Sequence, residues 1–139
     1  MILLDTVVLS ELRKKNPSPQ VVGWLSAFRD SDLFLSVVSL GEIERGIEKK
    51  RHDDPLFAAA LIRWLEDLLR LYGDRVLPVT PAIARRWGIL SAQYNNDGAD
   101  LLIAATGLVH GLQVATRNMR HFEPLGVAVV NPFEHGKIS

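Results

Sequence analysis

Short segments of consecutive apolar residues, separated by longer segments with helical periodicity, limit the fold of this chain more than any other feature. These short segments are apolar at neighbouring positions rather than alternate ones, as in strands that are buried on both faces. Such strands belong to parallel sheets that helices cover on both sides. The sequence therefore predicts an α/β fold, a three-layer α/β/α sandwich around a mostly parallel sheet. The strands are expected at residues 2–4, 33–38, 76–79, 112–116 and 127–130.

Proline and glycine mark the ends of the predicted helices. Pro19, Pro55 and Pro81 each follow a polar residue and can occupy the first helical position, where the backbone N–H has no intrahelical partner. Gly73 and Gly111 stand just after helical segments, where a left-handed cap is typical. The predicted helices are 7–15, 19–28, 40–51, 56–72, 82–94 and 101–110.

Composition indicates one ordinary globular domain, expected to span residues 1–139. The 139 residues are 47% hydrophobic and 23% charged, and they include no cysteine, which excludes disulfides and thiolate metal sites. The absence of cysteine fits the cytoplasm, and no segment approaches the ~18 apolar residues of a membrane span. Sixteen basic and sixteen acidic residues cancel, which argues against a general nucleic-acid coat protein but permits an enzyme with a local basic rim.

Three acidic residues occur where the predicted strands and helices meet. Asp5 directly follows the first strand, Glu42 lies in the first turn of the helix after the second strand, and Asp100 opens the helix before the fourth. Asn118 comes just after that fourth strand. In open α/β sheets, ligands bind beyond the carboxyl ends of the strands. We therefore expect these side chains to gather at one edge of the sheet.

Each acid also has a purely local explanation. Asp5 can cap the helix that begins at Val7, Ser39 and Glu42 match a capping box, and Asp100 can interact with a helix dipole. The local readings do not explain why three acids converge, since their repulsion calls for a cation. Hard oxygen ligands select magnesium, with manganese as the other choice. A metal held in this way activates water and suits phosphodiester hydrolysis.

The connection before Asp100 must bring the chain back across the sheet. A helix that runs antiparallel to its strand and ends near Tyr94 finishes at the far edge of the sheet. If this helix frays at Ser91, the nine residues that follow can make the crossing, because they span roughly 30 Å when extended.

Positive charge stands beside the predicted acidic site. Arg117 and Arg120 flank Asn118 and are expected to contact RNA phosphates, whereas the basic run 49–51 is interpreted as a solvated helix end. The four histidines lack the spacing of metal ligands. The tryptophans lie on amphipathic helices and are expected in the core or at an interface rather than stacked on bases: Trp24, Trp64 and Trp87.

Five motifs, in order along the chain, resemble a known family. They are MILLDT at 1–6, a strand followed by S-x-x-E at 33–42, ADLLIAAT at 99–106, VATRN at 114–118 and GVAVVNPF at 126–133. Together they resemble the PIN-domain ribonucleases, specifically the VapC/FitB-like toxins of type II toxin–antitoxin modules. The resemblance covers essentially the whole length of the chain.

The resemblance implies a PIN-like fold, a Mg²⁺-dependent ribonuclease activity, a homodimer and a small antitoxin that lies along an apolar groove. Two departures from the family pattern weaken the expected site: Val7 stands where relatives commonly have Asn, and Asn118 replaces an acid found in some relatives. The implied catalytic metal ligands are Asp5, Glu42 and Asp100, supported by Thr6, Ser39 and Asn118.

The leading hypothesis is therefore a magnesium-dependent endoribonuclease toxin that cleaves RNA through metal-activated water. Its alternative is a catalytically weak or inactive PIN-domain protein that binds RNA or its antitoxin without cleavage. An enzyme of the same fold that acts on DNA or on RNA processing is a further possibility. The residues do not separate these readings.

Overall fold

A computed structural model describes residues 1–136 of the chain. Five strands form one sheet in the order β3-β2-β1-β4-β5, and every pairing is parallel. The predicted α/β class and parallel sheet are confirmed. The strands are shorter than predicted, since pairing extends only over β1 (Ile2–Leu4), β2 (Leu33–Ser36), β3 (Val76–Leu77), β4 (Gln113–Ala115) and β5 (Val129–Val130).

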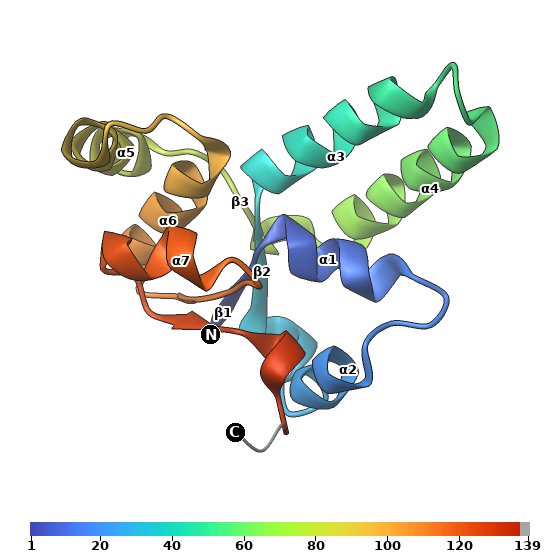
Figure 1. Cartoon of the computed structure of the whole chain (residues 1–139), viewed down its shortest axis with the longest axis horizontal. Helices are drawn as coiled ribbons and strands as arrows, with labels where there is room; N and C mark the ends of the chain where they lie inside the picture. Colours follow the sequence, from blue (N-terminus) through green and yellow to red (C-terminus); the bar gives the residue numbers. More distant parts are fainter. Residues whose placement is uncertain (137–139) are drawn as a thin grey trace.

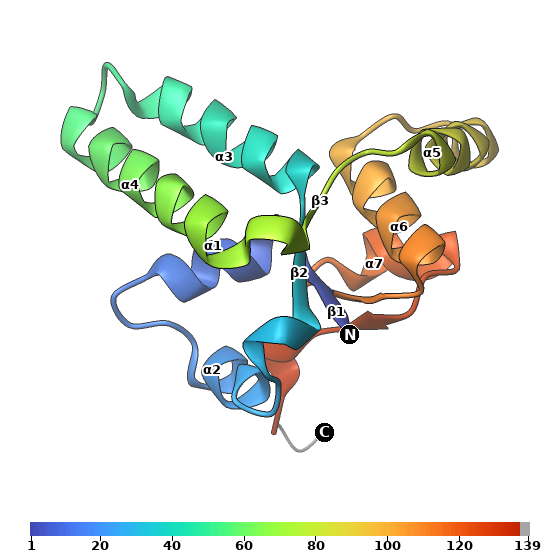
Figure 2. The same ribbon diagram turned by 180° about the vertical axis from the view of Figure 1, so that it is seen from behind.

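Helices cover both faces of the sheet, as Figures 1 and 2 show from opposite sides. The first four helices lie on one side of the sheet and the last three on the other. The predicted three-layer sandwich is thus confirmed. The helices are α1 (Thr6–Arg13), α2 (Pro19–Leu25), α3 (Val37–Lys50), α4 (Pro55–Tyr72), α5 (Pro81–Tyr94), α6 (Ala99–His110) and the short α7 (Met119–Phe122), which the sequence did not predict.

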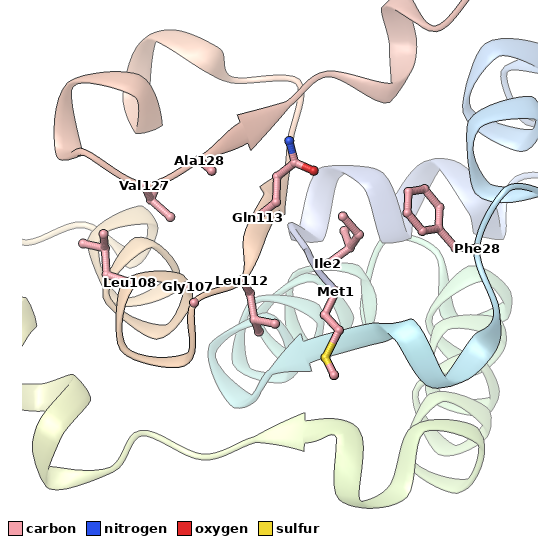
Figure 3. A pocket seen from close by; sticks show the side chains of 10 residues that line it. Met1, Ile2, Phe28, Gly107, Leu108, Leu112, Gln113, Val127 and Ala128 are labelled. Carbon is pink, nitrogen blue, oxygen red and sulfur yellow. The ribbon is translucent and has the colours of Figure 1, made fainter.

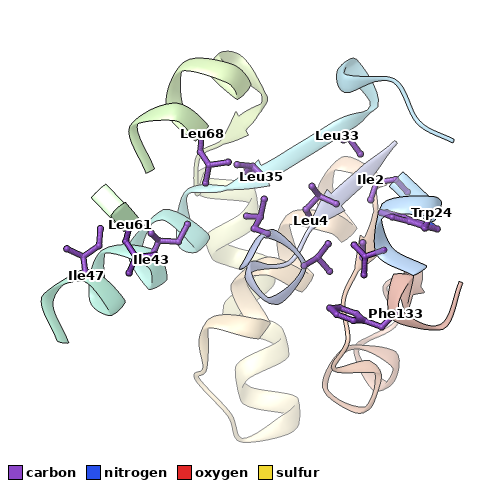
Figure 4. Close-up of a cluster of buried hydrophobic side chains, with 14 of the residues drawn as sticks. Ile2, Leu4, Trp24, Leu33, Leu35, Ile43, Ile47, Leu61, Leu68 and Phe133 are labelled. Carbon is purple, nitrogen blue, oxygen red and sulfur yellow. The ribbon is translucent and has the colours of Figure 1, made fainter. Parts of the chain in front are cut away.

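Alternate residues of the strands supply two separate hydrophobic cores. Ile2 and Leu4 pack with α1 to α4 in the cluster drawn in Figure 4, whereas Leu3 points to the opposite face and packs with α5 to α7. Trp24 is buried in the first core, as predicted for the tryptophans. Burial on both faces explains why the strands are apolar except at Ser36, the last residue of β2, and Gln113, the first residue of β4.

Most predicted helix ends are confirmed. Pro19, Pro55 and Pro81 each occupy a first helical position, and Gly111 closes α6 with a φ of 66°. The predicted cap at Ser39 is wrong. Strand β2 ends early and Ser36 caps α3, accepting a hydrogen bond of 3.0 Å from the backbone N–H of Val38. The β-branched residues at 37 and 38 therefore extend the helix rather than the strand.

The helix before Asp100 does not fray at Ser91. Helix α5 continues to Tyr94 and ends at Asn95, which adopts the left-handed conformation with a φ of 48°. Figures 1 and 2 show α5 almost end-on while α6 lies across the view, so α5 does not run back along the sheet. Residues 95–98 are therefore enough to reach the start of α6, and no long extended crossing is needed.

The strand order reverses at β1, because the chain passes from β1 to β2 on one side and later places β4 on the other. Leu4 is in register with Ala115, so the next residues, Asp5 and Thr116, lie side by side where these two strands end. Ligands of open α/β sheets bind at such a switch point. This edge is the first place to look for chemistry.

A cavity of about 510 Å³ lies at the opposite edge of the sheet, where the strands begin. Figure 3 shows its lining, which includes Met1, Phe28, Leu108 and Val127.

Within residues 1–136, no helix is both long and apolar enough to cross a membrane. Residues 137–139 of the predicted domain lie outside the described part of the chain.

Candidate active site

Asp5 lies between β1 and α1 in the candidate site, and it is only 3% exposed. Its Oδ1 accepts a hydrogen bond of 2.8 Å from the backbone N–H of Thr6, so the local reading of Asp5 as the cap of α1 is correct. Its Oδ2 accepts a hydrogen bond of 2.8 Å from the hydroxyl of Thr116, a residue 111 positions away. Asp5 therefore caps a helix and also faces the end of a neighbouring strand.

The electrostatics around Asp5 are unfavourable for its negative charge. Burial and the nearby charges of Asp100 and Glu42 raise the pKa of the Asp5 carboxyl from 3.8 to about 6, and burial is the largest cause. The hydrogen bonds from Thr116 and from the Thr6 backbone act in the opposite direction and are not strong enough to cancel it. A cation near Asp5 would relieve this cost.

Glu42 reaches the site through Thr6 rather than through a capping box. Its Oε1 lies 2.6 Å from the Thr6 hydroxyl, which also lies 2.8 Å from the hydroxyl of Ser39. A carboxylate can only accept, so Thr6 donates to Glu42 and Ser39 donates to Thr6. Because α3 begins at Val37, Glu42 lies in its second turn, and the expected first-turn position is wrong.

Asp100 lies in the first turn of α6, after Gly98 at the cap position. Its Oδ2 lies 3.0 Å from Nδ1 of His121, which comes from α7. The side chain of Asp100 is 29% exposed and that of His121 is 64% exposed. The carboxylate of Asp100 is therefore more exposed to solvent than that of Asp5, which is nearly enclosed.

A polar cavity of about 310 Å³ adjoins the acids where β4 and β5 end. The backbone N–H of Asn118 donates to the Thr116 hydroxyl at 2.9 Å, which links this loop to Asp5. The guanidinium of Arg117 lies 4.3 Å from the centroid of the Phe133 ring. The lining residues of this cavity are Arg117, Asn118, Met119, Arg120, His121, Asn131 and Glu134.

The three predicted acids thus surround one edge of the sheet, and Asp5 lies within the electrostatic reach of the other two. Among residues 1–136, no three His, Cys, Asp or Glu side chains stand close enough to hold one metal ion between them. The acids form an open cluster rather than a closed cage. Magnesium tolerates such a site, because it keeps several waters and commonly takes only one or two carboxylates.

Two residues at this edge were missed by the sequence analysis. Thr116 could have been found, because it follows β4 as Asp5 follows β1 and the parallel register places these residues together. His121 carried no signal, since α7 was not predicted and histidine spacing along the chain gave no pattern. Val7, the apolar departure from the family pattern, packs against the first core rather than into the acidic cluster.

Comparison with known proteins gives consistent similarities. A family model described as PIN domain matches residues 2–125. The chain is 35% identical over 144 residues to VapC ribonuclease Y4jK of Sinorhizobium fredii, covering 96% of this chain and 99% of the relative. It is 33% identical to toxin FitB of Neisseria gonorrhoeae, over the same shares of the two chains. The crystal structure of FitAcB from Neisseria gonorrhoeae matches with a TM-score of 0.78 and 32% identity, covering 96% of this chain and 99% of that one.

Proposed function

The chain belongs to the PIN-domain family, and on this premise we propose that it is a magnesium-dependent endoribonuclease toxin of a toxin–antitoxin module. The observation that carries the proposal is the environment of Asp5. This nearly enclosed carboxylate lies at the switch point of the sheet and within the fields of Asp100 and Glu42. The names of the relatives, a ribonuclease and a toxin, support the same activity and the same biological role.

The residues at the edge fit a magnesium ion by the chemistry of their oxygen donors. Asp5 would hold the ion, with Glu42 or Asp100 as a second direct ligand and the other acting through bound water. When bound, such an ion lowers the pKa of a water molecule and stabilises the charge that develops on a phosphodiester. Manganese has the same preference for oxygen ligands and is the expected substitute.

The protein's own part in this chemistry is to orient the acids. Thr116 and the Thr6 backbone hold both oxygens of Asp5, and the Thr6 hydroxyl holds Glu42. These hydrogen bonds fix the rotamers of the carboxylates and so reduce reorganisation when a cation and a substrate arrive. Arg117 and Arg120, which line the adjoining cavity, are proposed to bind phosphates of the RNA strand.

A nuclease assay tests this proposal. The purified chain, freed of any partner, is expected to cleave RNA in magnesium and to stop in EDTA, and Asp5→Asn is expected to abolish cleavage. The same assay with DNA separates the two substrate classes. Cleavage by Asp5→Asn without metal would reject the mechanism, and a folded wild-type protein that binds RNA without cutting it would support the non-catalytic alternative.

We further propose that a small cognate antitoxin covers an apolar channel beside Glu42. A cavity of about 210 Å³ runs from Glu42 to Phe57 and Trp64, between α1, α3 and α4. The guanidinium of Arg13 lies 5.0 Å from the Phe57 ring centroid and 5.8 Å from that of Trp64. An extended peptide with apolar anchors suits such a channel, and a basic side chain at its end would meet the acids.

Co-expression with the product of a neighbouring small reading frame tests this partner. The two proteins are expected to copurify, and Trp64→Glu is expected to abolish copurification because it places a charge in the apolar channel. Leu56→Glu is the matched control, because Leu56 is 84% exposed and lies outside the channel lining. Equal loss of copurification in both variants would contradict this docking site.

A homodimer through α5 is also proposed. Ile89 is 55% exposed on this helix, close in sequence to the partly buried Trp87. Ile89 is the most exposed large apolar side chain of α5, and across a two-fold axis it would pack against its own copy. Light scattering after size exclusion is expected to give a dimer for the wild type and a monomer for Ile89→Glu, and a monomeric wild type would contradict the dimer.

A further inference from the structure

The cavity beside the acids has the size and chemistry of a binding site in its own right. Its volume of about 310 Å³ lies at the lower end of the range in which small ligands bind, about 300–1,000 Å³. It opens where β4 and β5 end, and its lining comes from α7 and from the residues that follow these two strands.

Two hydrogen-bonded connections place this cavity next to the acidic cluster. His121 lines the cavity and contacts Asp100 with its Nδ1, 3.0 Å from the carboxylate oxygen. Asn118 also lines the cavity and donates its backbone N–H to Thr116, which in turn donates to Asp5. A strand of RNA whose phosphate lies at the acids can therefore place its neighbouring nucleotide in the cavity.

The cavity offers several donors and one anionic acceptor. Arg117 and Arg120 line the cavity and carry guanidinium donors, and the guanidinium of Arg117 lies 4.3 Å from the centroid of the Phe133 ring. Asn131 also lines the cavity; its Oδ1 accepts from the backbone N–H of Phe133 at 3.0 Å, and its Nδ2 is a further donor. The exposed carboxylate of Glu134 is the acceptor.

This arrangement matches guanine better than the other bases. A carboxylate can accept two neighbouring hydrogen bonds, and guanine alone presents two neighbouring donors, N1–H and the N2 amino group, on its Watson–Crick edge. Adenine and cytosine each offer one exocyclic amino group there, and uracil offers one ring N–H. Guanine O6 and N7 are the acceptors that arginine commonly binds in a bidentate manner. Single-stranded bases expose both edges.

We propose that this cavity is a guanine-preferring subsite for the unpaired nucleotide next to the cleaved bond, with Glu134 as the residue that selects the base. The inference rests on the proposed function for its place beside the cleaved bond, since it names the substrate of the same active site. Binding of a guanine nucleotide by itself does not require that function. The two ideas can therefore fail separately.

Nucleotide binding is the first test. Chemical-shift titration of the full chain without metal is expected to show 5′-GMP binding about tenfold more tightly than 5′-AMP, 5′-CMP or 5′-UMP, with shifts at Asn131 and Glu134. Glu134→Gln is expected to remove this preference. Glu123→Gln is the matched control, because Glu123 is an exposed acid outside the cavity lining and its loss is expected to leave the preference unchanged.

Cleavage of RNA that carries inosine in place of guanosine is the second test. Inosine lacks only the N2 amino group, so kcat/KM of the wild type is expected to fall about tenfold at that site. Glu134→Gln is expected to cleave both RNAs at similar rates. Because this test uses the wild-type protein, it remains decisive if a variant folds poorly.

The outcomes separate the inference from the proposed function. Preferential binding of 5′-GMP by a chain that cleaves no RNA would overturn the nuclease proposal and leave the guanine site standing. RNA cleavage without a preference for guanosine, together with equal binding of the four nucleotides, would overturn the guanine site and leave the nuclease standing. Preference that persists in Glu134→Gln would overturn the role of Glu134.

Discussion

The two edges of the sheet differ in a way that cavity size does not reveal. The amino edge holds the larger cavity, about 510 Å³, and its described lining is apolar except for Gln113. The carboxyl edge holds the smaller polar cavity, about 310 Å³, beside Asp5 and Asp100. Strand ends that meet helix starts bring polar side chains together at the carboxyl edge. In this parallel sheet, the charged side chains therefore locate the candidate active site better than the volume of the largest cavity does.

Substitutions at the two edges should separate activity from stability. A change at the carboxyl edge should affect catalysis with little loss of folding free energy, and a change at the amino edge should do the reverse. Four predictions follow this contrast, from the largest expected effect to the smallest.

Asp100→Asn is expected to lower kcat about 100-fold or more, because it removes a carboxylate that acts with Asp5 on the cation and the substrate. The free energy of unfolding should change by less than about 0.5 kcal/mol, since Asp100 is partly exposed. Initial rates of RNA cleavage measure the first quantity. The control is Asp97→Asn, an exposed acid three residues away. Equal losses in both variants would contradict the assignment of Asp100.

Asp5→Asn is expected to stabilise the metal-free protein above pH 6. The pKa of Asp5 rises from 3.8 unfolded to about 6 folded, so the folded state binds the extra proton and loses stability as pH rises through that window. At pH 7.5 the loss is at most about 3 kcal/mol, and the amide avoids it. Urea unfolding at pH 4 and pH 7.5 measures the difference. An equal effect at both pH values would contradict this charge cost.

Gly107→Ala is expected to destabilise the fold by about 1–3 kcal/mol without lowering kcat per folded molecule. A Cβ at this position would lie 3.0 Å from side-chain atoms of Val114 and Val127 and 3.2 Å from the carbonyl oxygen of Leu112. Gly111→Ala is a poor control, because its φ of 66° adds backbone strain. Gly46→Ala is suitable, since nothing lies within 4 Å of its added Cβ. A fall in kcat of folded Gly107→Ala would mean that the two edges are coupled.

Thr116→Val is expected to weaken divalent-cation binding about tenfold, because Asp5 loses the hydroxyl that orients its Oδ2. Thr116→Ser keeps the hydroxyl and is expected to retain most of the affinity. Calorimetric titration with manganese measures both. Wild-type affinity in Thr116→Val, or a loss in Thr116→Ser as large as that in Thr116→Val, would contradict the role of the hydroxyl.

The sheet and most helices could be predicted because their signals are local. Continuous apolar runs mark buried strands, and proline after a polar residue marks the starts of α2, α4 and α5. The end of β2 could not be predicted in the same way. Val37 and Val38 favour a strand by local preference, and tertiary packing overrides this preference to start α3 at Val37.

The sequence predicted the acidic residues of the candidate site but not the contacts that their side chains make. Strand ends and helix starts located Asp5, Glu42 and Asp100, since backbone topology alone brings them to one edge. The Thr6 hydroxyl between Ser39 and Glu42, and the contact of His121 with Asp100, depend on how helices cross. Such crossings are set by side-chain packing between distant segments, which periodicity along the chain does not encode.

The central claim is that Asp5 holds a divalent cation at the carboxyl edge, and manganese binding tests it without RNA. Electron paramagnetic resonance of free Mn²⁺, titrated with protein at pH 7.5, is expected to show binding by the wild type and by Asp97→Asn. Asp5→Asn is expected to bind at least about tenfold more weakly. Manganese affinity that is the same in Asp5→Asn and the wild type would contradict the account.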